Sequence, residues 1–593
     1  MTKTIVPSWD LSDLYKSVSD PKIKTDKKKI EGEVADFNKK YKDHKDISLL
    51  VALKEYSLII DLLYILANYA SLKFSENTQN VEVSSFYQQV MEFTTNISAS
   101  LAWFSLLISK LDDQNIKKLQ NQPGYSDFKH FIETRRQFKD FVLSEKEENI
   151  IIKKSVTGSE AFVKLYDQVD STQEYKLTLK GKTQKLSYSQ ITNLVKNHPD
   201  RKVRQKAVEA MAQTLSNDSN AKIYAFILNT LLLDKKVEDE LRGYKYPQES
   251  TFISYETPEK VVRAMIKAVT KSWYISERYY KAKSKLLGYK LYEWDRYSDI
   301  YVLKNKQKVD WNTSKQIILD SFSNFSPKFA EIASLFFEKN WIEAKLQTGK
   351  RGGAYCSYVS PSKHPYVFMN FDQSLEDVRT LGHELGHAIH GYLARGHNVL
   401  EFDASTAIAE IASIFAESVV FDDLISKTKD KKEKINLLAS QIQGSFATIF
   451  RQTAFYLYEE EIHNLRRQKG ELTAKDFSDL YQKHLQPMFG KGLTLTKDHQ
   501  CLWMPIAHFY HYNFYVYTYA FGELLAKSLY AIYKKEGQTF IDKYIKALSA
   551  GGSMSPSEIT KLMGVDISNE SFWESGLKII ENEVVEFEKL VLE

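Results

Sequence analysis

Residues 375–393 read LEDVRTLGHELGHAIHGYL, and both the fold and the chemistry of the chain follow from this stretch. Its apolar residues recur with helical spacing, and the two acids near its start suit the first turn of a helix. His383 and His387 are four positions apart, so a helix presents both imidazoles on one face, where they can share a zinc ion. Glu384 lies beside them, where a carboxylate can accept a proton from water on the metal. The sequence therefore predicts a zinc site in the middle of a helix.

Two neighbours of the motif refine this prediction. Gly386 costs a helix about 1 kcal/mol relative to Ala, so the position needs a reason such as close approach of another helix or of substrate. His390 lies about one turn beyond His387, but three ligands from one straight helix cannot readily surround an ion, so we expect a packing or supporting role for it. A metzincin would require His at position 393, where this chain has Leu393, and this argues against that class.

A third metal ligand is expected downstream, because a catalytic zinc usually takes three protein ligands. The apolar segment 404–417, ASTAIAEIASIFAE, carries two acids seven positions apart, Glu410 and Glu417. We expect a buried helix here with both acids on one face, and buried carboxylates need partners such as a metal and its histidines. Glu410 is predicted as the third ligand, and Glu417 as the group that orients a ligand histidine. The competing interpretation is a helix whose two acids face solvent.

These residues together resemble the oligoendopeptidase F branch of the thimet oligopeptidase-like zinc metallopeptidases. The specific part of the likeness is HELGH followed by AEIAS and Glu417. Weaker landmarks are WDLSDLY at 9–15, WDRY at 294–297, FRQ at 450–452 and SAGGS at 549–553. Ala416 and Ile414 depart from the Asn and Thr that are common in this branch. The resemblance covers essentially the whole chain.

The resemblance implies a mainly α fold in which two largely helical lobes enclose a deep active-site channel, with a small β-sheet next to the zinc helix. It also implies a zinc metalloendopeptidase, with one zinc per chain, that hydrolyses internal bonds of short unstructured oligopeptides. Water on the zinc would be the nucleophile and Glu384 the general base. A zinc carboxypeptidase of similar helical architecture is the main alternative. A non-catalytic helical scaffold with a vestigial motif is a further one, and the intact Glu384 argues against it.

A second group of candidate site residues lies at 508–519. His508, Tyr512, Tyr515 and Tyr519 have the spacing i, i+4, i+7 and i+11, which predicts one helix face carrying four hydrogen-bond donors. Such a stripe is more often part of a core, and other aromatic residues interleave with it on other faces. The resemblance instead implies that His508 and Tyr515 stabilise the oxyanion formed during peptide hydrolysis. It makes Tyr519 and Tyr512 candidate substrate contacts.

Residues 350–358, KRGGAYCSY, read as a glycine-hinged strand that would form a small sheet with residues 366–371. An unpaired strand edge can bind an extended peptide through its backbone, but an ordinary β-hairpin fits the pattern equally well. The resemblance favours the substrate edge, with Gly353, Ala354 and Tyr355 as contacts.

With 593 residues the chain exceeds the usual size of a single core, so at least two domains are expected. Alternating residues around Lys180-Gly181 predict a β-hairpin within 174–188, and this hairpin makes a plausible boundary. We expect an N-terminal helical domain of the oligopeptidase F type at 1–195 and a catalytic zinc metallopeptidase domain at 196–593.

Charge, hydropathy and cysteine content argue against several kinds of partner and location. The net charge is +5 from 81 basic and 76 acidic residues, with no basic block interleaved with aromatics, so no nucleic-acid partner is expected. No segment is a confident membrane span, and residues 1–7 lack the apolar core of a signal peptide. Cys356 and Cys501 provide no disulfide framework, which agrees with a cytoplasmic protein. The resemblance to oligoendopeptidase F implies oligopeptide substrates as the partners.

Overall fold

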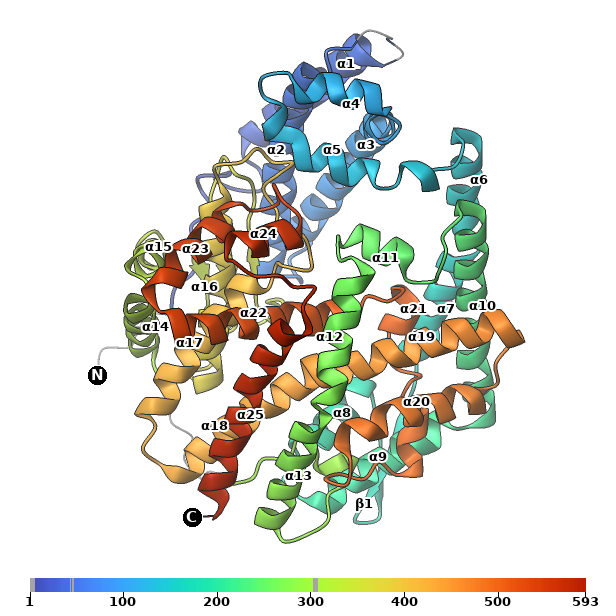
Figure 1. The fold of residues 1–593 in the computed structure, drawn as a ribbon, viewed down its shortest axis with the longest axis vertical. Helices are drawn as coiled ribbons and strands as arrows, with labels where there is room; N and C mark the ends of the chain where they lie inside the picture. The colour runs from blue at the N-terminus through green and yellow to red at the C-terminus, as the bar shows by residue number, and fades with distance from the viewer. Residues whose placement is uncertain (1–5, 43, 45–46, 302–307, 593) are drawn as a thin grey trace. The chain divides into compact units, whose positions relative to one another are not determined.

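Helices dominate the computed structural model of the chain, which describes residues 6–42, 44, 47–301 and 308–592 (Figure 1). Helices make up 69% of the structure and strands 3%, so the prediction of a mainly α fold is confirmed. The chain forms two compact units, each assembled from three stretches: 1–139, 305–426 and 532–566 in the first, and 140–304, 427–531 and 567–593 in the second. The expected boundary at residue 195 is a division along the sequence and stays a prediction.

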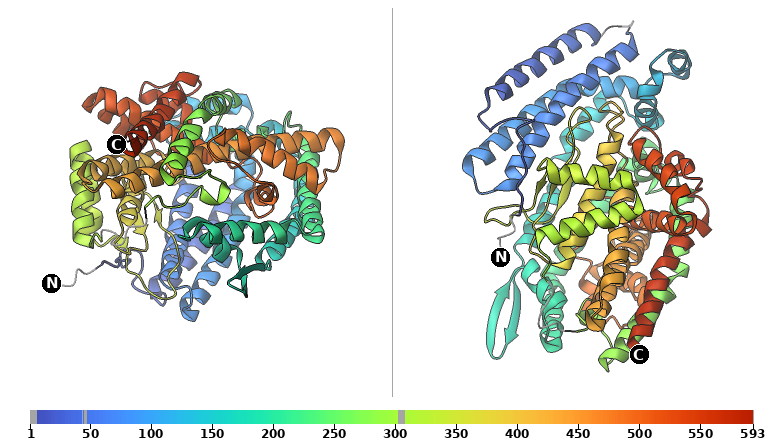
Figure 2. Two further views of the ribbon diagram at one scale, coloured as in Figure 1. Left: turned by 90° about the horizontal axis from the view of Figure 1, so that it is seen from below. Right: turned by 90° about the vertical axis from the view of Figure 1, so that its left-hand side faces the viewer.

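The first unit contains the three-stranded sheet and the helix with the two candidate zinc histidines. Its helices are α1 (Pro21–Tyr41), α2 (Leu49–Glu76), α3 (Val81–Ser109), α4 (Asp113–Gln120), α5 (Lys129–Arg136), α14 (Trp311–Phe325), α15 (Pro327–Glu338), α16 (Leu375–Ala394), α17 (Ile411–Lys427), α23 (Gln538–Ser549) and α24 (Pro556–Leu562). The long helices α1 and α2 run side by side, as the right-hand view of Figure 2 shows. Their shared core with α3 includes an edge-to-face pair formed by Phe37 and Phe104.

The second unit contains the β-hairpin and the remaining long helices. Its helices are α6 (Glu145–Ser155), α7 (Ser159–Ser171), α8 (Tyr188–Asn197), α9 (Arg201–Leu215), α10 (Asp218–Arg242), α11 (Glu249–Ser254), α12 (Glu259–Lys271), α13 (Trp273–Leu287), α18 (Lys431–Ser445), α19 (Arg451–Lys469), α20 (Ala474–Phe489), α21 (His508–His511) and α25 (Glu570–Leu592). Helix α22 (Tyr517–Glu536) begins in this unit and ends in the first.

The hairpin predicted at 174–188 is confirmed. Strands β1 (Tyr175–Leu179) and β2 (Lys182–Leu186) pair antiparallel. Lys180 and Gly181 join them with φ values of 48° and 75°. Two consecutive residues in the left-handed region match the twist of the flanking strands, and glycine adopts that conformation without a side-chain clash.

A small sheet packs against α16, as predicted. It consists of β3 (Ile342–Glu343), β5 (Tyr366–Phe368) and β4 (Tyr355–Ser357), in the order β3-β5-β4. Strand β5 pairs parallel with β3 and antiparallel with β4, so β4 is an edge strand. Both β4 and β5 contact α16. The parallel strand β3 was not anticipated from the sequence.

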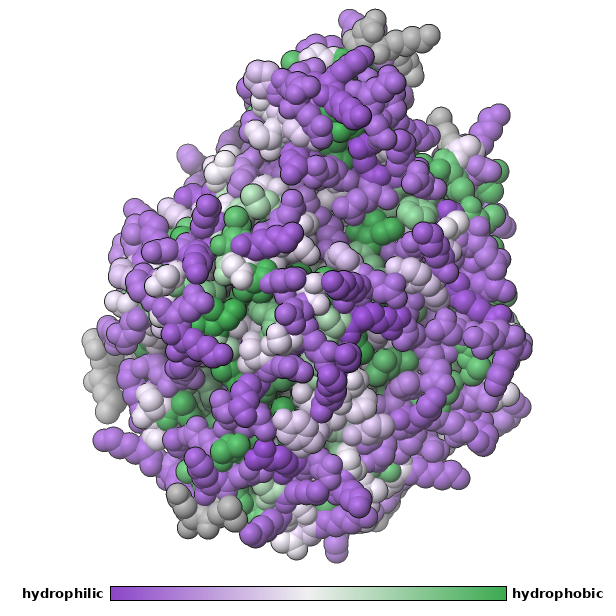
Figure 3. All heavy atoms as spheres, in the orientation of Figure 1, coloured by the Kyte–Doolittle hydropathy of each residue, from purple (hydrophilic) through white to green (hydrophobic). Residues whose placement is uncertain are grey.

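Hydrophilic side chains cover most of the face drawn in Figure 3, with apolar residues in small groups between them. Within the described part of the chain, no helix combines the length and apolar character needed to cross a bilayer.

Candidate active site

Helix α16 begins at Leu375 because Ser374 and Asp377 form a complete capping box at its start. The side-chain oxygen of Ser374 accepts a hydrogen bond from the backbone N–H of Asp377 at 3.1 Å, and the Asp377 carboxylate accepts one from the N–H of Ser374 at 2.8 Å. This reciprocal pair satisfies two backbone donors that a helix start otherwise leaves free. His383 and His387 therefore lie in the middle of a regular helix, as predicted.

The start of α17 approaches α16 closely at Gly386. A Cβ atom at this position would lie 2.5 Å from the carbonyl oxygen of Ala412 and 2.6 Å from the Cα of Ser413. Both distances are far inside van der Waals contact, so only glycine permits the approach. The close neighbour that the sequence required is thus another helix.

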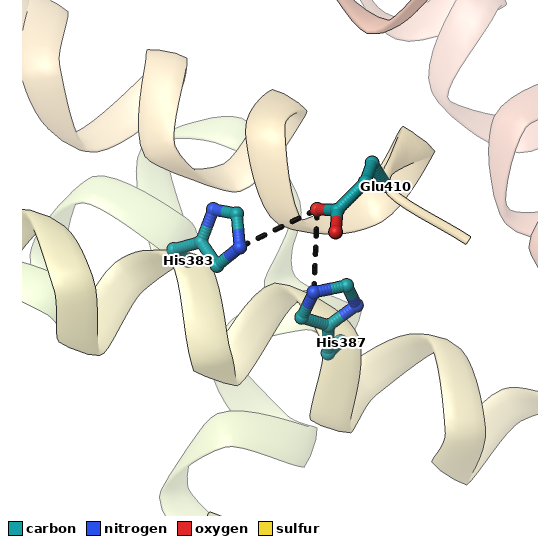
Figure 4. Close-up of side chains that lie close together, drawn as sticks. All are labelled: His383, His387 and Glu410. Atoms are coloured by element: carbon teal, nitrogen blue, oxygen red, sulfur yellow. Dashed lines mark ion pairs between the residues drawn. The ribbon is translucent and has the colours of Figure 1, made fainter. Parts of the chain in front are cut away.

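The imidazoles of His383 and His387 both point toward the carboxylate of Glu410 (Figure 4). Oε2 of Glu410 lies 3.4 Å from Nε2 of His383 and 3.3 Å from Nε2 of His387. One ligand atom from each residue can be chosen so that all three lie within 4.8 Å of one another. The structure thus brings together the three residues that the sequence selected.

The expected placement of Glu410 on a buried helix face is wrong. Turns occupy the residues before Ile411, where α17 begins, and Glu410 is the last residue before the helix. The N–H groups of Ile408 and Ala409 both donate to the carbonyl of Ser405, which closes a tight turn there. The side chain of Glu410 is 41% exposed. Its position at the entrance to the helix leaves the carboxylate free to face both histidines.

Glu417 lies two turns into α17 and contacts His383 from the opposite side of the ring. Its Oε2 is 3.2 Å from Nδ1 of His383, while its Oε1 accepts a hydrogen bond from Nη2 of Arg379 at 2.5 Å. A carboxylate on Nδ1 fixes the ring and keeps Nε2 directed at Glu410. Arg379 was not selected from the sequence, although it lies one turn before His383 on the same helix.

The electrostatics of this cluster follow from its alternating charges. Burial disfavours the charged form of His383, but the neighbouring Glu417 and Glu410 carboxylates outweigh it and raise the imidazole pKa to about 9. Partial loss of solvation by the surrounding protein likewise opposes ionisation of both glutamates. The hydrogen bond and charge of His387 nevertheless lower the pKa of Glu410 to about 2. Arg379 and His383 do the same for Glu417, whose pKa also falls to about 2. Both carboxylates are therefore ionised at neutral pH.

Glu384 differs from the other two acids. Its side chain is 5% exposed, and burial raises its pKa. Among the described residues its Oε2 has no hydrogen-bond partner. A buried carboxylate oxygen without a donor is costly unless a ligand or water completes it.

The donor set fits a zinc ion. Two imidazole nitrogens and one carboxylate oxygen are the ligands of one common class of catalytic zinc site, which keeps a further position open for water or substrate. The unpartnered oxygen of Glu384, next to two of those donors in the sequence, is where such a site places its acid–base group. His390 is outside the set. It is 2% exposed, its ring packs edge-on to Tyr358, and burial lowers its pKa to about 3.

The glycine-rich segment leads into edge strand β4. Gly353 adopts φ 83°, and its carbonyl accepts a hydrogen bond from Nδ2 of Asn370 at 3.0 Å. Ala354 follows, and Tyr355 opens the strand with its ring stacked on Phe368 at 4.9 Å between centroids. This packing fixes the segment at the edge of the sheet.

Residues 508–519 belong to the second unit and do not form one helix, so that expectation is wrong. Helix α21 ends at His511, Phe514 takes φ 57°, and α22 begins at Tyr517. The buried Glu459 carboxylate accepts the N–H of Phe514 at 2.5 Å, and Thr251 donates its hydroxyl to the carbonyl of Asn513 at 3.0 Å. Both bonds occupy backbone groups that a continuous helix would use.

The four candidate side chains of this segment nevertheless gather. Nε2 of His508 lies 3.1 Å from the hydroxyl of Tyr519, and the Tyr515 ring is 5.1 Å from Tyr519 and 5.4 Å from Tyr512. Tyr512 is 56% and Tyr519 36% exposed. The interleaved aromatic residues are buried instead: Tyr510, Phe514, Tyr517 and Phe521. The break in the helix thus separates an accessible set of rings from a core set. Glu459, which holds the break, was missed from the sequence because nothing local marks it.

Comparison with known proteins identifies the family. Residues 194–579 match the model of peptidase family M3, and residues 108–175 match the model described as oligopeptidase F. The chain is 28% identical to oligopeptidase PepF of Bacillus subtilis over 553 residues, covering 92% of this chain and 81% of the relative. It is 26% identical to an oligoendopeptidase F homolog of Borreliella burgdorferi, covering 98% of each chain.

Solved structures share the fold. A putative peptidase from Chlamydophila abortus superposes with a TM-score of 0.86 at 23% identity, covering 99% of each chain. Oligoendopeptidase-F from Enterococcus faecium gives a TM-score of 0.71 at 21% identity, covering 96% of this chain and 99% of that structure. The family match, the relatives and the two-histidine, one-glutamate cluster agree: this chain belongs to peptidase family M3 and is a metallopeptidase.

Proposed function

We propose that this metallopeptidase is a zinc-dependent oligoendopeptidase that cleaves internal bonds of short, unstructured peptides. The observation that carries the proposal is the convergence of His383, His387 and Glu410, together with the Oε2 atom of Glu384, which has no hydrogen-bond partner among the described residues and lies on the helix of the two histidines. Zinc, when held by those three residues, would supply a Lewis acid that polarises the peptide carbonyl and acidifies water.

The other steps of peptide hydrolysis are assigned to side chains and backbone groups of the chain. Glu384 accepts a proton from the attacking water and passes it to the departing amine, and burial favours this exchange because it raises the pKa of the carboxyl. Glu417 holds the His383 ring through Nδ1. From the resemblance to oligoendopeptidase F we assign His508 and Tyr515 to stabilisation of the oxyanion. Positioning of the peptide is assigned to Tyr512, Tyr519 and the strand edge at Gly353, Ala354 and Tyr355.

The decisive experiment replaces Glu384 with Gln, which keeps the shape of the side chain and removes its basicity. We expect the variant to retain zinc by elemental analysis and to lose about 10²- to 10⁴-fold in kcat on an internally quenched peptide. Glu338→Gln makes the same change at an exposed position of α15 and should leave activity intact. Near-normal turnover of Glu384→Gln would remove this residue from the mechanism.

Two further assays define the substrate class. A peptide blocked at both ends separates an endopeptidase from a zinc carboxypeptidase, because the latter requires a free C-terminus. The family resemblance also leads us to infer a deep channel that admits only short peptides. Efficient digestion of a folded protein, compared with a ten-residue peptide, would contradict that inference. The free thiols Cys356 and Cys501 agree with the proposed cytoplasmic location.

A further inference from the structure

A cavity of about 400 Å³ in the second unit carries an unusual concentration of positive charge. Residues of α8, α9, α19 and the 3₁₀ turn η5 (Lys497–Cys501) line it. Helices α8 and α9, which pack against each other, are labelled in the lower part of Figure 1. Three cationic side chains line it: Lys196, Arg296 and Arg451. Apolar side chains, including Val208 and Phe455, form other parts of its wall.

None of these three cations forms an ion pair among the described residues, although Glu293 is close enough to Arg296 to affect its pKa. Within the described part of the chain, no carboxylate oxygen lies within 4.0 Å of any of them. Arg451 donates from Nη1 to the hydroxyl of Tyr297 at 2.6 Å, and the Nε atoms of Arg296 and Arg451 are both buried without a hydrogen bond among the described residues. Buried guanidinium donors of this kind are normally satisfied by a carboxylate or phosphate.

The one acid that lines the cavity is already engaged. Glu293 is 4% exposed, and its carboxylate accepts hydrogen bonds from the N–H of Thr496 at 3.0 Å and from the Thr496 hydroxyl. Burial raises the pKa of Glu293. Three cations therefore face at most one partly compensating anion.

The adjacent acid, Asp295, is directed away from Arg296. Its carboxylate pairs with Arg201 at 2.8 Å and with Arg204 at 3.0 Å. The buried ammonium of Lys283 donates to the carbonyls of Asp295 at 3.0 Å and Ser298 at 2.8 Å. This network fixes the backbone on both sides of Arg296 without neutralising its charge.

The positive charges around the cavity affect the pKa of Tyr297, which also lines it. Burial alone would raise the pKa of the Tyr297 phenol, yet the nearby Arg296, Arg451 and Lys196 lower it below its ordinary value. A field that overcomes burial would stabilise any anion that enters.

We propose that this cavity binds a carboxylate group, with Arg296 and Arg451 as its hydrogen-bond donors and Lys196 at its exposed side. Guanidinium forks match the planar geometry of a carboxylate, and the apolar walls suit an attached hydrocarbon group. His508 also lines the cavity. The carboxylate can come from two sources. One is the C-terminus of a peptide, and this assignment rests on the proposed function. The other is a free small carboxylate, and this assignment does not depend on the proposed function.

The test uses the full-length protein after removal of metal, so that binding is measured without hydrolysis. A labelled ten-residue peptide with a free C-terminus is compared with its C-terminal amide by fluorescence anisotropy at constant ionic strength. In parallel, thermal unfolding is compared in sodium acetate and sodium chloride of equal ionic strength. The variants are Arg296→Gln and Lys196→Gln. Lys202→Gln removes the same charge from an exposed site on α9 and serves as the matched control.

If the peptide C-terminus is the ligand, the acid should bind about tenfold to a hundredfold more tightly than the amide in the wild type and in Lys202→Gln. That preference should collapse in Arg296→Gln and weaken in Lys196→Gln. If a free carboxylate is the ligand, acid and amide bind alike, and acetate raises the unfolding temperature in all but the cavity variants.

The proposal is overturned if neither the peptide preference nor the acetate effect depends on Arg296 or Lys196. Stabilisation by inorganic phosphate without any effect of acetate would also overturn it. Lys196 is exposed, so its substitution keeps the test valid even if Arg296→Gln fails to fold. Failure of the proposed peptidase function would give a different result: the zinc-loaded protein would not hydrolyse peptides, but acetate would still raise the unfolding temperature.

Discussion

Substitution of Gly386 by Ala tests whether the approach of α17 to α16 sets the geometry of the metal centre. The new Cβ would lie 2.5 Å from the Ala412 carbonyl oxygen, whereas ordinary contacts start near 3.4 Å. The helices would have to separate locally by about 0.9 Å, because the clash is with backbone atoms that cannot rotate away. Metal–ligand distances tolerate only about 0.2 Å, so Glu410 would move outside the range in which it and the histidines share one ion.

Two opposing terms set the stability change of this variant. Overpacking costs about 1–3 kcal/mol, and the backbone contact places this case at the upper end. The better helix propensity of Ala returns about 1 kcal/mol. We therefore expect a net loss of ~2 kcal/mol in the free energy of unfolding of the metal-free protein, together with zinc affinity lowered by at least about tenfold.

Zinc affinity is measured by competition with a chromophoric chelator, and stability by urea denaturation without metal. Gly382→Ala is the matched control, since its Cβ would meet the side-chain ends of Val420 at 3.0 Å and Ile318 at 3.3 Å. Those methyl groups can shift, so zinc affinity should change little. Wild-type zinc affinity in Gly386→Ala would refute the reasoning that the glycine holds Glu410 in place.

Three other substitutions probe the acids of the structure. Glu410→Ala should abolish stoichiometric zinc binding, and unchanged zinc by elemental analysis would overturn its assignment as a ligand. Glu417→Gln should weaken zinc by about 10- to 100-fold in a chelator competition while leaving some binding, because it only orients His383. Burial raises the pKa of Glu459 to about 8, above the 4.5 of an unperturbed glutamate. Between these two pH values the folded state binds one proton more than the unfolded state, so the wild-type free energy of unfolding falls as the pH rises. Glu459→Gln keeps an acceptor for the N–H of Phe514 but cannot ionise. Measured by urea denaturation, its free energy of unfolding relative to wild type should rise by about 1–3 kcal/mol between pH 4.5 and pH 8. A difference that does not change with pH would contradict a protonated Glu459 in the folded protein.

Local patterns predicted the elements whose determinants are local. The metal helix begins where Ser374 and Asp377 form its cap, and the β1–β2 hairpin turns at Lys180-Gly181, so both were found from the sequence. Glu410 was found by chemistry, since an acid in an apolar stretch requires a partner. Its exposure and its place before α17 depend on a turn that the hydrophobic pattern does not reveal.

The features that escaped prediction depend on distant partners. The break between α21 and α22 requires Glu459, which is 55 positions before Phe514. Periodicity cannot detect a bond of that kind, and it predicted a continuous helix. Strand β3 is only two residues long and pairs in parallel with β5. A strand this short has no alternation to recognise.

The assembly of the first unit from three stretches has a consequence for biosynthesis. Helix α23 packs on α16, and the hydroxyl of Tyr544 donates to the carbonyl of Ile411 at 3.1 Å, at the very start of α17. At usual translation rates, roughly 8–30 s separate the emergence of α16 from that of α23. During this interval α23 is not yet available to pack on α16 and on the start of α17, so apolar surface of these two helices stays exposed on the growing chain. We therefore expect nascent chains to need chaperone protection, and the metal centre to reach its final form only after almost the whole polypeptide has left the ribosome.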